Sequence, residues 1–155
     1  SVCSCVYKLE FLRDKKIQFD ENYSYGEDQK FVIDCLTSSS DFKYFKFPIL
    51  AYVNYDNSAT GIYNPKWFHS YQVFSSIYQR AELSCYKNEL ENRMNNELLA
   101  IANKIIMQNN FFESLMFIRK NILPLRHRIH KLASFVLFEI PFLYVFLYRS
   151  YKFFR

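Results

Sequence analysis

The sequence predicts an α/β region that is followed by an all-helical region. In residues 1–61, short runs of alternating apolar and polar residues indicate strands, and one run with helical spacing stands between them. After Pro65, apolar residues recur every three or four positions and the strand pattern ends. We therefore expect three parts: mixed structure over 1–61, a helical extension over 62–125, and a C-terminal helix within 126–155.

The first part contains the predicted strands. Residues 2–12 indicate a strand or turn and then a short helix, which a solvated turn over 14–16 follows. A helix is expected from about Glu27 to Leu36, where apolar side chains are spaced for one face. Two aromatic-rich runs, 42–47 and 49–55, are typical of strands, and the proline between them favours a break or a sheet edge.

The second part has the pattern of packed helices. Asn109-Asn110 interrupts this pattern, and a short helix over 111–119 follows. Such apolar stripes belong to a core far more often than to a cofactor site. The residues expected on the buried faces are Trp67, Phe68, Tyr71, Phe74, Ile77, Tyr78, Leu90, Met94, Leu98, Ile101 and Ile105, with Met107 as a further candidate.

The composition excludes several kinds of site. The chain has 155 residues, half of them hydrophobic, which is enough for one domain with a real core. Its two glycines exclude a Gly-rich phosphate loop. The four cysteines and three histidines form no zinc-binding pattern, so we expect free thiols in a reducing cytosol.

Basic charge is concentrated near the C-terminus. Residues 1–60 carry a net charge of −2 and residues 61–155 a net charge of +7, and from Arg119 onward eight Lys and Arg residues accompany a single acid, Glu139. A basic tail implies an anionic partner. Nucleic acid is disfavoured, because the basic residues flank an apolar run and do not line a groove. We therefore expect residues 126–155 to bind an anionic membrane surface.

The apolar run in this tail extends from Leu132 to Tyr148 and contains Glu139 and Pro141. Three arrangements stay open: interfacial or re-entrant anchoring, a spanning helix near the lower limit of length, and a helix packed in a protein core or oligomer. Interleaved aromatic and basic residues suit the headgroup region. They favour the first arrangement, with the protein in the cytoplasm and peripheral to the inner face of the cell membrane.

One stretch combines acidic residues with a glycine and the start of a helix. Gly26 precedes Glu27 and Asp28, and the helical pattern begins directly behind them. A tight turn at Gly26 would deliver both carboxylates to the first turn of the helix, where they face the positive end of the helix dipole. Acids in this place commonly do no more than cap the helix, so the pattern alone favours capping over chemistry.

The neighbouring motifs favour chemistry. They occur in an order that resembles the second half of a bacterial family 2 glycosyltransferase with the GT-A fold, and the resemblance covers residues 1–61. It implies that this region is the acceptor-side part of a nucleotide-sugar transferase. The motifs are YKLEFL at 7–12, IQFDE at 17–21, GEDQKF at 26–31, Tyr52, and NSAT at 57–60.

The resemblance implies an inverting transfer of a sugar from a nucleotide-sugar donor to a glycan or lipid-linked acceptor, in the synthesis of bacterial surface polysaccharides. Asp28 would be the general base that takes the proton of the acceptor hydroxyl. Glu27 would support the turn or contact the acceptor, and Gly26 would let the backbone approach closely. Further substrate-binding candidates are Asp20, Glu21 and Ser58.

The family also implies a divalent cation, Mg2+ or Mn2+, on the diphosphate of the donor. Its ligands belong to an Asp-x-Asp motif, and the sequence contains no such motif. We therefore expect the metal ligands and the nucleotide-binding half upstream of these residues, and no metal within this chain. Residues 1–155 alone are expected to be inactive. The alternative function is that of a non-enzymatic, membrane-associated helical adaptor or interaction protein.

Overall fold

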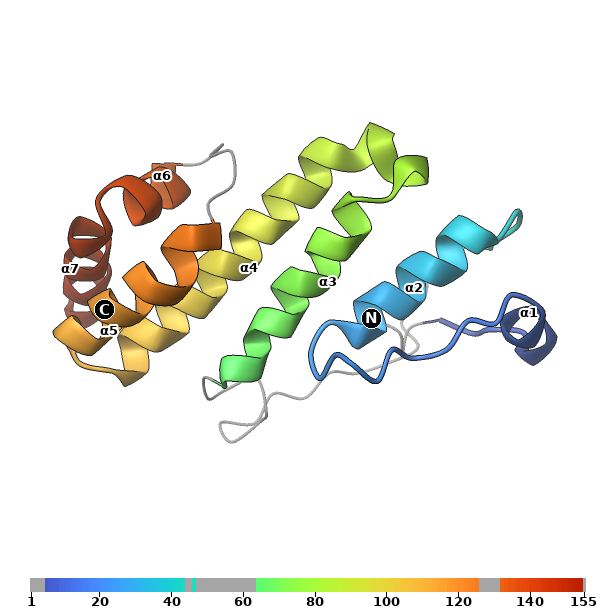
Figure 1. Cartoon of the computed structure of the whole chain (residues 1–155), viewed down its shortest axis with the longest axis horizontal. Helices are drawn as coiled ribbons and strands as arrows, with labels where there is room; N and C mark the ends of the chain where they lie inside the picture. Colours follow the sequence, from blue (N-terminus) through green and yellow to red (C-terminus); the bar gives the residue numbers. More distant parts are fainter. Residues whose placement is uncertain (1–4, 44–45, 47–63, 126–131, 155) are drawn as a thin grey trace.

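The computed structural model describes residues 5–43, 46, 64–125 and 132–154, and the regular elements in these ranges are helices (Figure 1). The N-terminal part contains α1 (Leu9–Asp14) and α2 (Glu27–Ser38). The middle part contains the 3-10 turn η2 (Pro65–Trp67), α3 (Phe68–Tyr78), the 3-10 turn η3 (Ala81–Tyr86) and the long helix α4 (Lys87–Gln108). The C-terminal part contains α5 (Phe111–Phe117), the π-helical turn η4 (Ile118–Ile122), the 3-10 turn η5 (Leu123–Leu125), α6 (Leu132–Glu139) and α7 (Pro141–Phe153).

The predicted α/β fold is wrong, because the described part of the chain is helical and contains no strand. These residues therefore do not form the GT-A arrangement that the resemblance implied. The alternation at Ile17 and Phe19 arises in an irregular loop, where Phe19 packs on Phe31 of α2. The strand predicted over 49–55 lies outside the described residues, as do residues 44, 45 and 47 of the one over 42–47.

Helices α2, α3 and α4 lie side by side (Figure 1). The short turn η3 joins α3 and α4 into an antiparallel pair, and α2 packs on the other side of α3. The helix α2 begins at Glu27, as predicted, and runs two residues beyond Leu36. This arrangement fixes the start of α2, with Gly26, Glu27 and Asp28, against the N-terminal half of α3.

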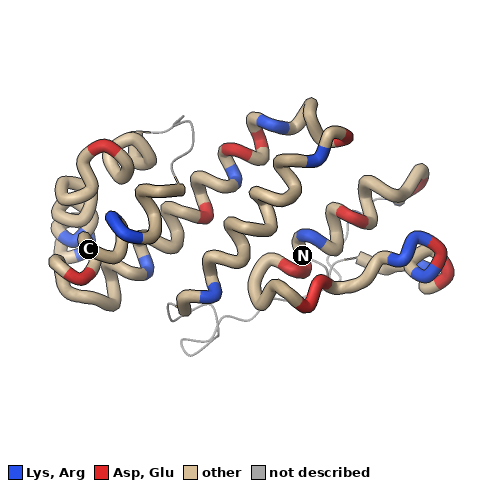
Figure 2. The backbone as a smooth tube through the Cα atoms, in the orientation of Figure 1, with Lys and Arg blue, Asp and Glu red and all other residues tan. Residues whose placement is uncertain are grey.

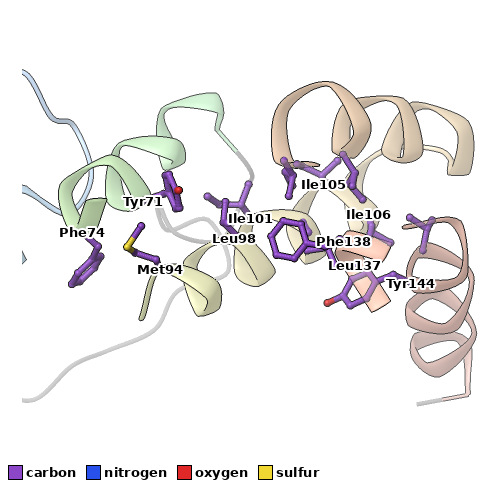
Figure 3. Close-up of a cluster of buried hydrophobic side chains, with 14 of the residues drawn as sticks. Tyr71, Phe74, Met94, Leu98, Ile101, Ile105, Ile106, Leu137, Phe138 and Tyr144 are labelled. Atoms are coloured by element: carbon purple, nitrogen blue, oxygen red, sulfur yellow. The ribbon is translucent and has the colours of Figure 1, made fainter. Parts of the chain in front are cut away.

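The helix α4 supplies the centre of the hydrophobic core (Figure 3). Its apolar residues recur at three- and four-residue steps and are buried against α3 on one side and the C-terminal helices on the other. Each fully buried Leu or Ile contributes about 1.5–3 kcal/mol to folding. The buried residues of α4 include Leu90, Met94, Leu98, Ile101, Ile105 and Ile106. Met107 was a further core candidate, but it is 52 % exposed and Ile106 is buried beside it.

The C-terminal helices complete the core. The predicted break at Asn109-Asn110 is confirmed, and the side chain of Asn110 accepts a hydrogen bond from the backbone N–H of Glu113 at 2.8 Å, which caps α5. The apolar run from Leu132 to Tyr148 forms two helices, because Pro141 cannot continue α6 and instead begins α7. Both helices bury apolar residues against α4 and each other. Among the described helices, none has the length and apolar character needed to cross a bilayer.

Candidate functional site

Gly26 fixes the start of α2 against α3. Its backbone is left-handed, with φ of +82°, a conformation that side chains other than glycine's rarely allow. A Cβ atom at this position would lie 3.0 Å from the Cα of Ser70 on α3. The two helices approach this closely only because residue 26 lacks a side chain. The predicted turn at Gly26 is therefore confirmed, and it serves helix packing as well as chain direction.

Phe31 anchors the same helix from below its first turn. Its ring is 5 % exposed and stacks on the ring of Phe19, with centroids 4.4 Å apart and planes 8° apart. The ring of Tyr7 contacts Phe31 edge-on, with centroids 5.2 Å apart. Aromatic pairs of this kind add about 0.5–1.5 kcal/mol beyond the burial itself. Three segments that are separate in the sequence thus meet at Phe31 and hold the N-terminal end of α2 in place.

The two carboxylates of the first turn have different surroundings. Asp28 is partly exposed, and its Oδ1 accepts a hydrogen bond from the backbone N–H of Gln29 at 2.8 Å. The Oε2 atom of Glu27 is buried and has no hydrogen-bond partner among the described residues. A buried carboxylate oxygen normally has such a partner. Glu27 therefore has a buried oxygen without a described partner, whereas Asp28 is partly exposed.

The loop before Gly26 is held by two sets of hydrogen bonds. The Oδ1 of Asp20 accepts from the backbone N–H of Asn22 at 3.1 Å and from its side-chain amide at 2.9 Å. The backbone N–H of Asn22 is the main reason why the pKa of Asp20 lies below its usual value, and the Asn22 amide and the Lys30 ammonium lower it further. Farther along, the backbone N–H of Ser24 donates to Nδ1 of His69 on α3 at 2.9 Å.

An ionic network lies on the other side of α2. The ammonium of Lys30 is 3.6 Å from a carboxylate oxygen of Asp20 and 3.0 Å from one of Asp34. Arg80, just beyond α3, binds the second oxygen of Asp34 at 2.6 Å. These residues line an open polar groove of about 700 Å³, together with Glu21 and the loop from Lys15 to Asn22. Figure 2 shows basic and acidic residues along α1, the loop after it and α2.

The structure separates the predicted site residues into two groups. Asp20 and Glu21 lie in the polar groove with Lys30. Asp28 does not line this groove, since positions 28 and 30 lie on roughly opposite faces of a helix. Asp20 and Glu21 are therefore not brought together with Asp28. Ser58 lies outside the described residues.

His69 and Arg80 position the site, and the sequence analysis did not predict either role. His69 holds the loop before Gly26, and Arg80 fixes Asp34 on α2. Both act over a long separation in sequence, so no local motif carries a signal for them. The nearest sequence feature for Arg80 is its place just after the apolar helical pattern that includes Ile77 and Tyr78.

The described residues do not fit a divalent cation. Within the described ranges, no cluster of three or more His, Cys, Asp or Glu could hold a metal. The carboxylates of Asp20 and Asp34 converge, but on the ammonium of Lys30, which already supplies a positive charge between them. Cys35 and Cys85 are free thiols, and burial raises the pKa of the Cys35 thiol.

Comparison with protein families, with curated proteins and with solved structures yields no match to this chain.

Proposed function

We propose that this chain is the acceptor-side part of a glycosyltransferase in which Asp28 acts as the general base. One observation supports the proposal above all: residues of three separate motifs jointly fix the first turn of α2, since Tyr7 and Phe19 pack on Phe31 and Gly26 contacts α3. This turn carries Glu27 and Asp28. The proposal depends on this local site and on the motif order, and it does not require the GT-A fold.

In the proposed reaction, the acceptor hydroxyl attacks the anomeric carbon of a nucleotide-activated sugar. The new carbon–oxygen bond forms while the bond from the sugar to the diphosphate breaks, and the nucleoside diphosphate leaves with the bonding electrons. The hydroxyl proton passes to Oδ2 of Asp28. A carboxylate suits this role because the proton is lost as the bond forms, so the base must be ionised and well placed.

Glu27 is proposed to orient the acceptor. Its buried Oε2 has no partner in the described part of the chain, so an acceptor hydroxyl would become its donor if the Glu27 side chain turned outward. The donor nucleotide and its Mg2+ or Mn2+ ion would be held by residues upstream. We accordingly expect transfer from the enzyme that includes those residues, and none from residues 1–155 alone.

The experiment replaces Asp28 with Asn in the full-length enzyme. Release of nucleoside diphosphate from a panel of nucleotide-sugar donors is measured, with membrane glycan extract as the acceptor. Asp28→Asn keeps the size of the side chain and its hydrogen bond to Gln29, so we expect unchanged far-UV circular dichroism and a loss of turnover of at least about 100-fold. The control is Asp41→Asn, which changes an exposed aspartate beyond the end of α2 and should leave turnover unchanged. Full turnover in Asp28→Asn would remove the basis of the proposal.

A non-enzymatic, membrane-associated helical adaptor is the second candidate. The observation that favours it is the exposed apolar surface of α7, because a membrane-binding helix needs no catalytic residue. The adaptor predicts that Asp28→Asn retains the cellular effect of the protein. The glycosyltransferase predicts that this variant behaves like a deletion, so complementation of a deletion strain separates the two.

A further inference from the structure

The helix α7 is apolar on two opposite faces. Its inner face buries Tyr144 and Val145 against the core. On its outer face, spacings of four and seven residues bring Phe142, Phe146 and Phe153 into one line, and these side chains are 53 %, 59 % and 87 % exposed. Leu147 and Phe154 lie next to that line and are also exposed. We call these five residues the outer face of α7.

The apolar surface extends beyond α7 onto the helix that packs against it. The helix α6 buries Leu137 and Phe138, while Leu132 and Phe135 on its other side are exposed. Scattered exposed apolar residues are normal on soluble proteins, but a run of phenylalanines and leucines along adjacent helices marks a binding surface.

The sequence from Arg119 onward carries a net positive charge. Lys152 is exposed on α7 itself, and Arg119 and Lys120 are exposed in η4, while Glu113 on α5 and Glu139 at the end of α6 are exposed acids. From Arg119 to the end of the chain, Glu139 is the sole acid among eight basic residues. Exposed phenylalanines are favoured at the boundary between headgroups and acyl chains of a bilayer, and basic residues are favoured beside anionic headgroups. A surface that carries both therefore complements a bilayer with anionic lipid.

We propose that the outer face of α7 inserts into the interface of a membrane that contains anionic phospholipid. The helix lies along the membrane surface, with its inner face still packed on α4 and its outer phenylalanines among the first acyl carbons. A second copy of this chain is a poorer occupant of the same face, because both copies would bring the same exposed Lys152 to the contact. The proposal is independent of glycosyl transfer by Asp28.

The test is co-sedimentation of the full chain with vesicles of phosphatidylcholine, with and without phosphatidylglycerol. We expect binding to the anionic vesicles and at least about tenfold weaker binding to the neutral ones. The double variant Phe142→Ser/Phe146→Ser should weaken binding to anionic vesicles by at least about tenfold, because two apolar side chains no longer leave water. A second variant, Phe153→Ser/Phe154→Ser, acts on two exposed side chains at the C-terminal end of α7 and should also weaken binding without affecting the fold.

The matched control is Leu36→Ser/Phe42→Ser. These residues are 50 % and 74 % exposed near the end of α2, so the control removes similar apolar surface far from α7. It should bind vesicles as well as the wild-type chain does. The proposal is overturned if the wild-type chain does not bind anionic vesicles, or if both α7 variants bind as it does. It is equally overturned if sedimentation velocity detects a wild-type dimer that the α7 variants dissociate, since a second copy would then cover this face.

Discussion

The guanidinium group of Arg149, on α7, donates a hydrogen bond to the backbone carbonyl of Ile106 at 2.9 Å, near the C-terminal end of α4. The same nitrogen contacts the carbonyl of Asn109 and lies 3.5 Å from Oγ of Ser114. The last carbonyls of a helix lack partners within it and carry its partial negative charge. Arg149 therefore caps α4 from another helix and links the central helix of the core to α7.

The first prediction concerns this cap. Arg149→Met keeps an unbranched apolar stem but removes the donors, so the carbonyls at the end of α4 lose a charged partner. We expect the free energy of unfolding to fall by about 1–3 kcal/mol, measured by urea denaturation followed by circular dichroism. Lys152→Met removes one positive charge from an exposed position of the same helix and should change stability by less than about 0.5 kcal/mol. Equal stabilities of the two variants would contradict the capping role.

The second prediction concerns Lys16, which has a left-handed backbone with φ of 54° directly after α1. Its N–H donates to the carbonyl of Arg13, and the N–H of Ile17 donates to that of Leu12. This pair of bonds defines a Schellman motif, whose left-handed position is usually glycine. Lys16→Gly should therefore raise the melting temperature, with a gain of about 0.5–1 kcal/mol. Lys15→Gly is the control, since Lys15 has a right-handed backbone and glycine there should give no gain.

The third prediction concerns Gly26. In Gly26→Ala, the new Cβ would lie 3.0 Å from the Cα of Ser70 in a backbone conformation that alanine disfavours. We expect a loss of about 2–4 kcal/mol, because α2 must move away from α3 or its start must change conformation. Chemical denaturation measures the loss, and hydrogen exchange should locate it at the start of α2. A variant as stable as the wild type would show that the two helices do not approach closely here.

Local patterns in the sequence were sufficient to predict part of the fold. The start of α2 after Gly26 and the break at Asn109-Asn110 depend on a turn and a cap, which adjacent residues determine. The α/β prediction fails for the described residues, because alternation over a few residues also occurs in loops, as at Ile17 and Phe19. The choice between Ile106 and Met107 for the core depends on where α4 meets α7, and periodicity near a helix end does not determine it.

The candidate site was predictable to a smaller extent. The sequence placed Glu27 and Asp28 in the first turn of a helix, because glycine and acid preferences at helix starts are local. It did not predict that Lys30 and Arg80 would neutralise Asp34, or that His69 would hold Ser24. These contacts join residues that are distant in the sequence and meet only after α2 packs on α3. The catalytic role of Asp28 stays a prediction.

The fourth prediction concerns Tyr144, whose hydroxyl donates to the side-chain carbonyl oxygen of Asn103 at 2.8 Å. Burial, with a smaller contribution from neighbouring Tyr148, raises the pKa of Tyr144 to about 12, from an ordinary value of 10.0. Since the folded state holds this proton more tightly than the unfolded state, stability is intact below pH 10 and falls as the pH rises toward 12. This ionisation should remove about 2–3 kcal/mol over that interval. In Tyr144→Phe, the free energy of unfolding at pH 7 should be about 1 kcal/mol lower, because the hydrogen bond to Asn103 is lost. Above pH 10, this free energy should fall less steeply than in the wild type, as measured by urea denaturation at successive pH values. The control Tyr151→Phe changes an exposed tyrosine of the same helix, and its stability should depend on pH as that of the wild type does. If the stability of Tyr144→Phe fell as steeply above pH 10 as that of the wild type, the raised pKa would be contradicted.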